Sequence, residues 1–261
     1  MTAVSTRGLI IRTADVKESD RLLTIFTEDF GVISAYARGA RTLKSRKMSS
    51  TMQFCYADFV LDRRNDGFSV KETELIESFF DIRSSLEGLA LAGYITEVLS
   101  DVAVAMPERE LLRLALNSLY AISKGLHSPD KIKGAFEIRT ASILGFMPDV
   151  VACRDCGMRH GNFFFDIMGG SIECSDCRRG HQLKRDEERG DYEARIICPL
   201  SEGAKIALGY CISSPVEKIF SFNISEEDMR LFSKAAEEYL LNQLERSFRS
   251  LDFYKEVKPK R

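Results

Sequence analysis

Two pairs of cysteines have the spacing of metal ligands. Cys153 and Cys156 form one CxxC pair and Cys174 and Cys177 form a second, with 17 residues between the pairs. A CxxC turn directs two thiolates at a point about 2.3 Å away, so two turns brought together complete a tetrahedral shell. Four thiolates leave no open coordination position for water. The pattern therefore predicts a structural zinc site rather than a catalytic one.

Other interpretations of these cysteines are a redox CxxC pair or buried free thiols, and iron also accepts four thiolates. Two pairs at this spacing favour a metal over the first two alternatives. His160 and His181 lie nearby in the sequence, and we expect both at the protein surface. The unpaired cysteines should be small buried apolar residues: Cys55, Cys198 and Cys211.

A second candidate site is a run of ten residues from Arg38 to Lys47 that contains five basic side chains and no acid. The basic residues are Arg38, Arg41, Lys44, Arg46 and Lys47, and Arg63 and Arg64 form a smaller pair downstream. Such a run can bind phosphate groups of a nucleic acid, although a solvated loop that uses charge for solubility is the alternative. Tyr36 and Phe54 flank the run and could stack on bases or belong to the core.

The composition limits these possibilities. The chain has 261 residues with 37 basic and 39 acidic side chains, a net charge of −2, so a nucleic-acid surface must be a local patch. Met1–Gly8 lacks the apolar stretch of a signal peptide, and no segment approaches the ~20 apolar residues of a membrane span. We therefore expect a cytoplasmic protein. No Walker loop, HExxH or GxSxG motif is present, which argues against a metal-dependent hydrolase.

The elements that would carry these sites change character along the chain. Five short β-type runs in the first 80 residues predict a small β-barrel, with Asn65-Asp66-Gly67 as the turn between the last two strands. Helical periodicity follows from about residue 81. The predicted strands cover 8–13, 21–27, 31–37, 54–61 and 68–73, and the predicted helices cover 86–105, 108–124, 130–144 and 226 to about 248.

Several segments together resemble the RecO family of recombination mediators, in the same order and over nearly the whole chain. These are Lys17–Gly31, the "KGAR"-like Ala37–Arg41, Phe136-Glu137 and Leu144–Pro148 leading into Cys153, and Arg246–Phe253. The resemblance implies an α+β chain of several parts: an N-terminal OB-fold barrel (1–80), a helical body in two parts (81–150 and 191–261) and an inserted four-cysteine zinc ribbon (151–190).

The resemblance also implies a non-catalytic function in DNA repair. Family members bind single- and double-stranded DNA and anneal complementary strands. They associate with RecR, bind the C-terminal tail of single-stranded-DNA-binding protein (SSB) and help RecA to load onto DNA. These activities imply that the chain is located at the nucleoid. Arg38 and Arg41 match the family's basic motif best, and the four paired cysteines match its zinc ligands. The rival interpretation is a protein-interaction scaffold with structural zinc and little direct DNA binding.

Overall fold

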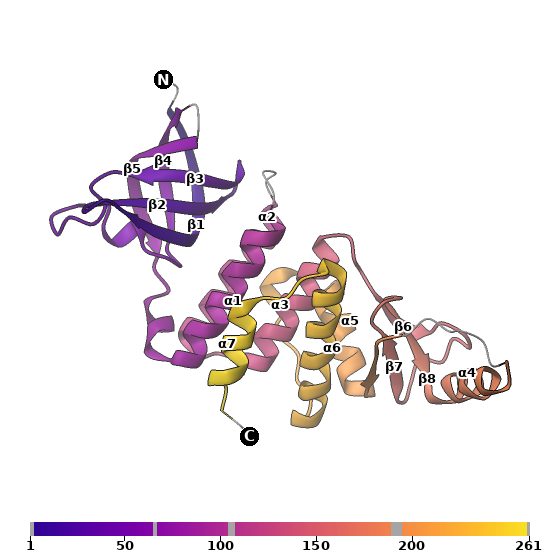
Figure 1. Ribbon diagram of the computed structural model, residues 1–261. Helices are drawn as coiled ribbons and strands as arrows, with labels where there is room; N and C mark the ends of the chain where they lie inside the picture. The colour runs from indigo at the N-terminus through magenta and orange to yellow at the C-terminus, as the bar shows by residue number, and fades with distance from the viewer. Residues whose placement is uncertain (1–2, 65–66, 104–107, 189–194, 260–261) are drawn as a thin grey trace. The chain divides into compact units, whose positions relative to one another are not determined.

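The N-terminal part of the chain is a closed five-stranded β-barrel (Figure 1). A computed structural model describes residues 3–64, 67–103, 108–188 and 195–259 of the chain. Around the barrel the strands follow the order β1-β2-β3-β5-β4, and only the β3–β5 pair is parallel. The strands are β1 (Ala3–Val16), β2 (Asp20–Thr27), β3 (Gly31–Ala37), β4 (Tyr56–Arg64) and β5 (Gly67–Glu77).

Alternation of apolar side chains explains why these segments close into a barrel. Residues 33, 35 and 37 of β3 face inward and are buried, while 32, 34 and 36 face outward. The inward residues of all five strands share one core that includes Leu23, Ile25, Phe59 and Leu61. Side chains with this period of two fill a small barrel without leaving a channel. The predicted N-terminal barrel is confirmed.

The chain folds into two compact units, Met1–Leu126 with Phe248–Arg261, and His127–Ser247. In the first unit the barrel is followed by η2 (Phe80–Ser84), α1 (Leu86–Val102) and α2 (Arg109–Lys124). The last helix, α7 (Arg249–Val257), packs against α1, as Figure 1 shows. The backbone N–H of Ser250 donates to Glu97 over 3.0 Å, and the Tyr94 and Phe248 rings lie 5.9 Å apart between centroids.

The second unit combines a helical layer with a small sheet. Helices α3 (Pro129–Ile143), α5 (Glu202–Ser213) and α6 (Glu226–Leu244) pack together, and η3 (Val216–Lys218) joins the last two. Gly134 of α3 permits the close approach of α6, because a Cβ there would lie 2.6 Å from the Phe232 ring. The sheet follows the order β6-β8-β7-β9. Its elements are β6 (Asp149–Cys153), β7 (Phe163–Asp166), β8 (Ser171–Cys174) and β9 (Ile197–Leu200), with α4 (Ser175–Glu188) between the last two in the chain.

The sequence predictions differ from these elements mainly at their ends. β1 is longer than predicted because it pairs with β2 along one part and with β4 along another. The helix predicted over 86–105 ends at Val102, and residues 104 and 105 lie outside the described part, as do Asn65 and Asp66 of the predicted turn. Helices α4, α5 and α7 were not predicted. Among the helices that are described, none is long and apolar enough to cross a membrane.

Candidate nucleic-acid interface and metal centre

The basic segment, which we define as Arg38–Lys47, is tied to the barrel through Arg41. The backbone N–H of Arg41 donates to the Ser19 carbonyl over 2.9 Å. Its guanidinium donates to the carbonyls of Lys17 and Glu18, each at 3.2 Å, and lies 3.3 Å from an Asp15 carboxylate oxygen. Arg41 therefore holds the β1–β2 turn against the basic segment, and its charge is already partnered.

Lys47 ties the other end of the basic segment to β5. Its ammonium donates to the Val70 carbonyl over 2.7 Å, and burial lowers its pKa. Between these two ties, Ala40 is fully buried in the barrel core. The segment is thus an exposed loop that is tied to the barrel at both ends, and two of its five cations serve to position it.

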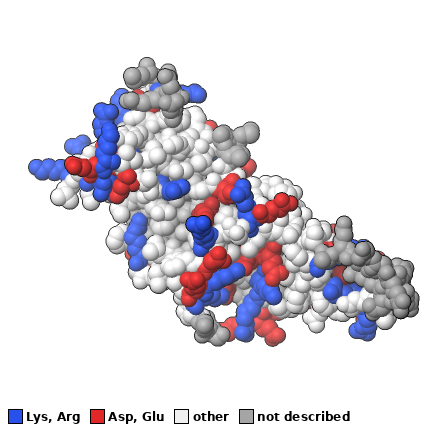
Figure 2. Space-filling model, in the orientation of Figure 1, with Lys and Arg blue, Asp and Glu red and all other residues white. Residues whose placement is uncertain are grey.

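The other three cations of the basic segment face solvent. Arg38, Lys44 and Arg46 are exposed, and none of them forms an ion pair with another described residue. Figure 2 shows Lys and Arg side chains gathered at the end of the barrel on the left of the view, with a few acidic side chains among them. This arrangement leaves positive charge available to an external phosphate.

Arg63 lies near the end of β4. It pairs with Phe68 of β5, and Phe68 pairs in turn with Ala35 of β3, three residues before Arg38. The Arg63 side chain is exposed, whereas the side chain of Arg64 lies outside the described part of the structure. Of the flanking aromatic residues, Phe54 is a core residue with 3% exposure, and Tyr36 is half-buried on the outward face of β3.

Asp20 is a positioning residue that the sequence did not reveal. Its carboxylate is buried and accepts hydrogen bonds from the Gly39 N–H at 2.7 Å, the Tyr36 hydroxyl at 2.5 Å and the Ser19 hydroxyl at 3.1 Å. These donors hold the pKa of Asp20 below its ordinary value, the Gly39 N–H most strongly. The ionised carboxylate therefore fixes the start of the basic segment and the Tyr36 side chain together.

We expect Asp20→Asn to remove part of the acid sensitivity of the barrel. The stabilisation by Asp20 is complete above the ordinary aspartate pKa of about 3.9 and is lost as the pH falls through the lower pKa of the folded state. The melting temperature of the Asn variant should be lower at pH 6 and should fall less than that of the unaltered protein on acidification to pH 3. Asp252→Asn, at an exposed position on α7, is the control. Parallel melting curves for all three proteins would contradict this role.

The four paired cysteines come together at the end of the small sheet. Their sulfur atoms all lie within 4.8 Å of one another, and those of Cys156 and Cys174 are 3.7 Å apart. Cys153 ends β6, Cys174 ends β8, and Cys177 lies in the first turn of α4. Between the two pairs the chain forms a β-hairpin of β7 and β8. The sequence prediction of a four-cysteine cluster is confirmed.

The donor chemistry of this cluster fits a soft divalent metal. Backbone N–H groups of Cys174 and Cys177 donate to the sulfurs of Cys153 and Cys174, at 3.3 and 3.5 Å. Burial alone would raise the pKa of Cys153, but N–H donors of Cys156 and Cys174 outweigh it and bring the pKa to about 7. Cysteine sulfurs are the ligands that zinc prefers in structural sites. The cluster can therefore hold a metal with all four sulfurs.

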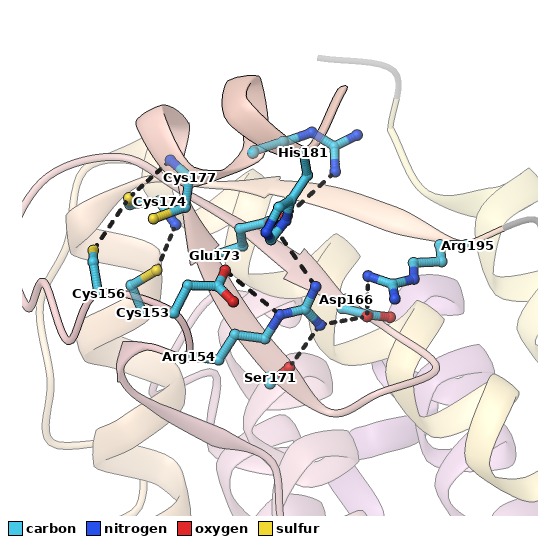
Figure 3. A network of polar contacts seen from close by, with 12 residues as sticks. Cys153, Arg154, Cys156, Asp166, Ser171, Glu173, Cys174, Cys177, His181 and Arg195 are labelled. Carbon is cyan, nitrogen blue, oxygen red and sulfur yellow. Dashed lines mark hydrogen bonds and ion pairs between the residues drawn. The ribbon is translucent and has the colours of Figure 1, made fainter. Parts of the chain in front are cut away.

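A network of ion pairs braces the cluster (Figure 3). Arg154, between the first two cysteines, lies 3.0 Å from Asp166 and 3.8 Å from Glu173, both of which are buried. Glu173 also contacts Arg178 at 3.8 Å and His181. Asp155, Glu173 and His181 have ligand atoms close together, but the two arginines already neutralise Glu173. We therefore interpret this group as bracing rather than as a second metal site.

The remaining sequence predictions concern the histidines near this site and the unpaired cysteines. His160 is at the surface as predicted and contacts Glu202 at 2.8 Å. His181 contacts the buried Glu173, and its side chain is still 40% exposed. Cys55, Cys198 and Cys211 are buried, with 1%, 2% and 0% exposure, as predicted.

Comparisons with known proteins agree with this architecture. Residues 1–79 match the family model "Recombination protein O N terminal", and residues 83–252 match "Recombination protein O C terminal". The chain is 36% identical to the DNA repair protein RecO of Acetivibrio thermocellus over 98% of this chain and 97% of that protein. It is 26% identical to the DNA repair protein RecO of Caldicellulosiruptor saccharolyticus, over 99% of this chain and 100% of that protein.

A third relative, the DNA repair protein RecO of Desulforamulus reducens, is 28% identical over 94% of this chain and 91% of that protein. The family models cover the barrel as well as both helical parts and the four-cysteine cluster. The chain therefore belongs to the RecO family of DNA repair proteins.

Proposed function

We propose that this chain is a DNA-binding recombination mediator without catalytic activity of its own. It binds single- and double-stranded DNA through the barrel, anneals complementary strands, and with RecR helps RecA to load onto DNA covered by SSB. The observation that carries the proposal is the set of three exposed cations without acidic partners on a pinned segment of the barrel, in a chain whose net charge is −2. Family membership supports the same function.

The proposal divides the tasks among the parts of the chain. The barrel (1–80) contacts phosphates through Arg38, Lys44, Arg46, Arg63 and Arg64, while Arg41 and Lys47 position the basic segment. The helical parts (81–150 and 191–261) bind RecR and the SSB tail. The cysteine module (151–190) holds a zinc ion through Cys153, Cys156, Cys174 and Cys177. This ion links the two CxxC turns and has a structural role. A protein with these partners works in the cytoplasm, at the nucleoid.

Annealing follows from charge neutralisation. Cations on one barrel hold phosphates of two strands while their base edges stay accessible, and the repulsion between the strands falls. Because the basic segment contacts phosphates, its binding is tolerant of sequence and depends strongly on salt.

Replacing Arg38, Lys44 and Arg46 together by Gln should weaken binding to a single-stranded oligonucleotide and flatten its salt dependence. Each phosphate contact on a single strand contributes about −0.7 to the slope of log K against log salt, so the slope should change by about 2. Fluorescence anisotropy at several salt concentrations measures this slope. Arg41 and Lys47 are left in place because their loss would displace the basic segment.

A matched control carries the same change of charge elsewhere, through Lys124→Gln, Lys218→Gln and Lys234→Gln at exposed positions. This control should keep the unaltered slope. If the Arg38, Lys44 and Arg46 variant also keeps it, the basic segment does not bind phosphates. If the unaltered protein binds no DNA at low salt yet captures an SSB-tail peptide and RecR, the chain is an interaction scaffold instead.

A further inference from the structure

A cavity of about 330 Å³ opens at the end of the barrel that carries the basic segment. It is lined by Val16 and Lys17 of β1 and the turn after it, by Tyr36 and Arg38 at the end of β3, and by Ser69 of β5. The cavity exists because β3 and β5 pair over only two positions, Ala35 with Phe68 and Tyr36 with Ser69. Past Tyr36, the chain of β3 turns away into the basic segment.

The charged lining of this cavity is available to a ligand. Lys17 and Arg38 are exposed, and neither forms an ion pair with any residue that the structure describes. The Lys17 carbonyl is held by Arg41, which places the lysine in the left-handed backbone conformation with φ of 54°. Two cations, one directly after β1 and one directly after β3, thus line one cavity that has no acid among its lining residues.

The aromatic part of the lining is held in one orientation. The Tyr36 ring lies on the outward face of β3, and its hydroxyl donates to the buried Asp20 carboxylate over 2.5 Å. Leu22, the cross-strand partner of Tyr36 on β2, is 40% exposed and extends the apolar surface beside the ring. A ring fixed in this way loses little conformational entropy when a flat group stacks on it.

We propose that this cavity binds one unpaired nucleotide of a DNA strand, with its phosphate at Lys17 and Arg38 and its base against Tyr36. The inference rests on the proposed DNA binding by the barrel. It identifies this cavity as the place where the protein distinguishes a single strand from a duplex. The volume is near the lower end of small-molecule sites, which begin at about 300 Å³. A base in a duplex is stacked and paired inside the helix, so a duplex offers the cavity phosphates alone.

Tyr36→Leu should lower the affinity for a single-stranded oligothymidylate by about tenfold, within the range for loss of one stacked base. The affinity for a duplex of equal length should change less than twofold. Lys17→Gln should flatten the single-strand salt slope by about 0.7. Tyr120→Leu, at an exposed tyrosine of α2, and Lys124→Gln are the matched controls. Fluorescence anisotropy measures all of these affinities.

A second measurement uses the unaltered protein and does not depend on the folding of a variant. Irradiation of an oligonucleotide that carries 5-iododeoxyuridine should cross-link Tyr36, identified by mass spectrometry, with the single strand and not with the duplex. Free thymidine monophosphate at the same concentration should not compete, because it lacks the neighbouring phosphates that the exposed cations bind.

The outcomes separate this inference from the proposed function. Equal single-strand affinity of the Tyr36→Leu, Lys17→Gln and unaltered proteins, or absence of a cross-link at Tyr36, overturns the nucleotide site while DNA binding by the barrel stands. An equal loss of single-strand and duplex affinity in Tyr36→Leu overturns the discrimination. If the unaltered protein binds neither form of DNA, the proposed function fails, and this inference fails with it.

Discussion

Removal of the metal is expected to unfold the cysteine knuckles and α4 while the barrel stays folded. Structural zinc contributes about 10–16 kcal/mol of apparent binding free energy in small modules, more than the packing of a short segment supplies. The turn after Cys153 is largely exposed, and the described side chains of α4 are mostly exposed or half-buried. Phe165 of β7, by contrast, packs against Tyr239 of α6 with ring centroids 5.1 Å apart, so β7 should keep its protection.

Hydrogen exchange followed by mass spectrometry, with and without a chelator under reducing conditions, measures this difference segment by segment. Residues 154–161 and 175–183 should exchange fastest after chelation, and the barrel should be unaffected. Metal analysis of the purified protein should give one zinc per chain. Equal protection with and without the chelator would show that the metal does not hold the module.

Substitution of one ligand provides a matched test. Cys156→Ser should reproduce the effect of the chelator, because Cys156 is exposed and has little packing to lose. Cys55→Ser changes the same atom in the barrel core, where the Ser49 carbonyl can accept a hydrogen bond from the new hydroxyl. This variant should retain the full metal content.

Lys133→Ala is expected to destabilise the second unit by about 3–5 kcal/mol, the usual cost of leaving one partner of a buried ion pair behind. The Lys133 ammonium lies 3.0 Å from Glu137 and 2.7 Å from Glu237, and its side chain is 3% exposed. Burial alone would lower the pKa of Lys133, but the two carboxylates outweigh it and raise the pKa. The Glu137 side chain is fully buried and would lose its cation. Urea unfolding measures the change.

Two further variants identify the cause of that loss. The double variant Lys133→Met with Glu137→Leu removes the two most buried of the three charges, and it should recover most of the stability because Glu237 is 16% exposed and can be solvated. Lys234→Ala breaks the exposed ion pair with Glu238 on α6 and should cost about 0–1 kcal/mol. If the double variant is as unstable as Lys133→Ala, lost packing rather than the loss of the Lys133 ion pairs is responsible.

Local patterns were sufficient to predict the parts of the fold that a short window of sequence determines. The cysteine cluster follows from two CxxC pairs, since each turn already places two sulfurs together. The barrel strands follow from side-chain alternation. The missed helices lack such a signal: α4 is almost entirely polar, and α5 has apolar side chains around most of its circumference because α3, α6 and β6 surround it. Their positions depend on partners far away in the sequence.

In the candidate DNA site, too, some residues could be predicted from a short window of sequence, whereas others depend on contacts with distant parts of the chain. From composition alone, the five cations of the basic segment are equally good candidates for phosphate binding. Contacts with the β1–β2 turn and with β5 decide that Arg41 and Lys47 are partnered and that Arg38 is not. The sequence left Tyr36 between base stacking and the core and gave no role to Lys17 or Asp20, because these residues come together only once β1, β2 and β3 have paired.

The pairing of α7 with α1 has a consequence for biosynthesis. The entire unit His127–Ser247 lies between α1 and α7 in the chain, so α1 leaves the ribosome long before α7 has been synthesised. During that interval the face of α1 that later contacts α7 is uncovered on the nascent chain.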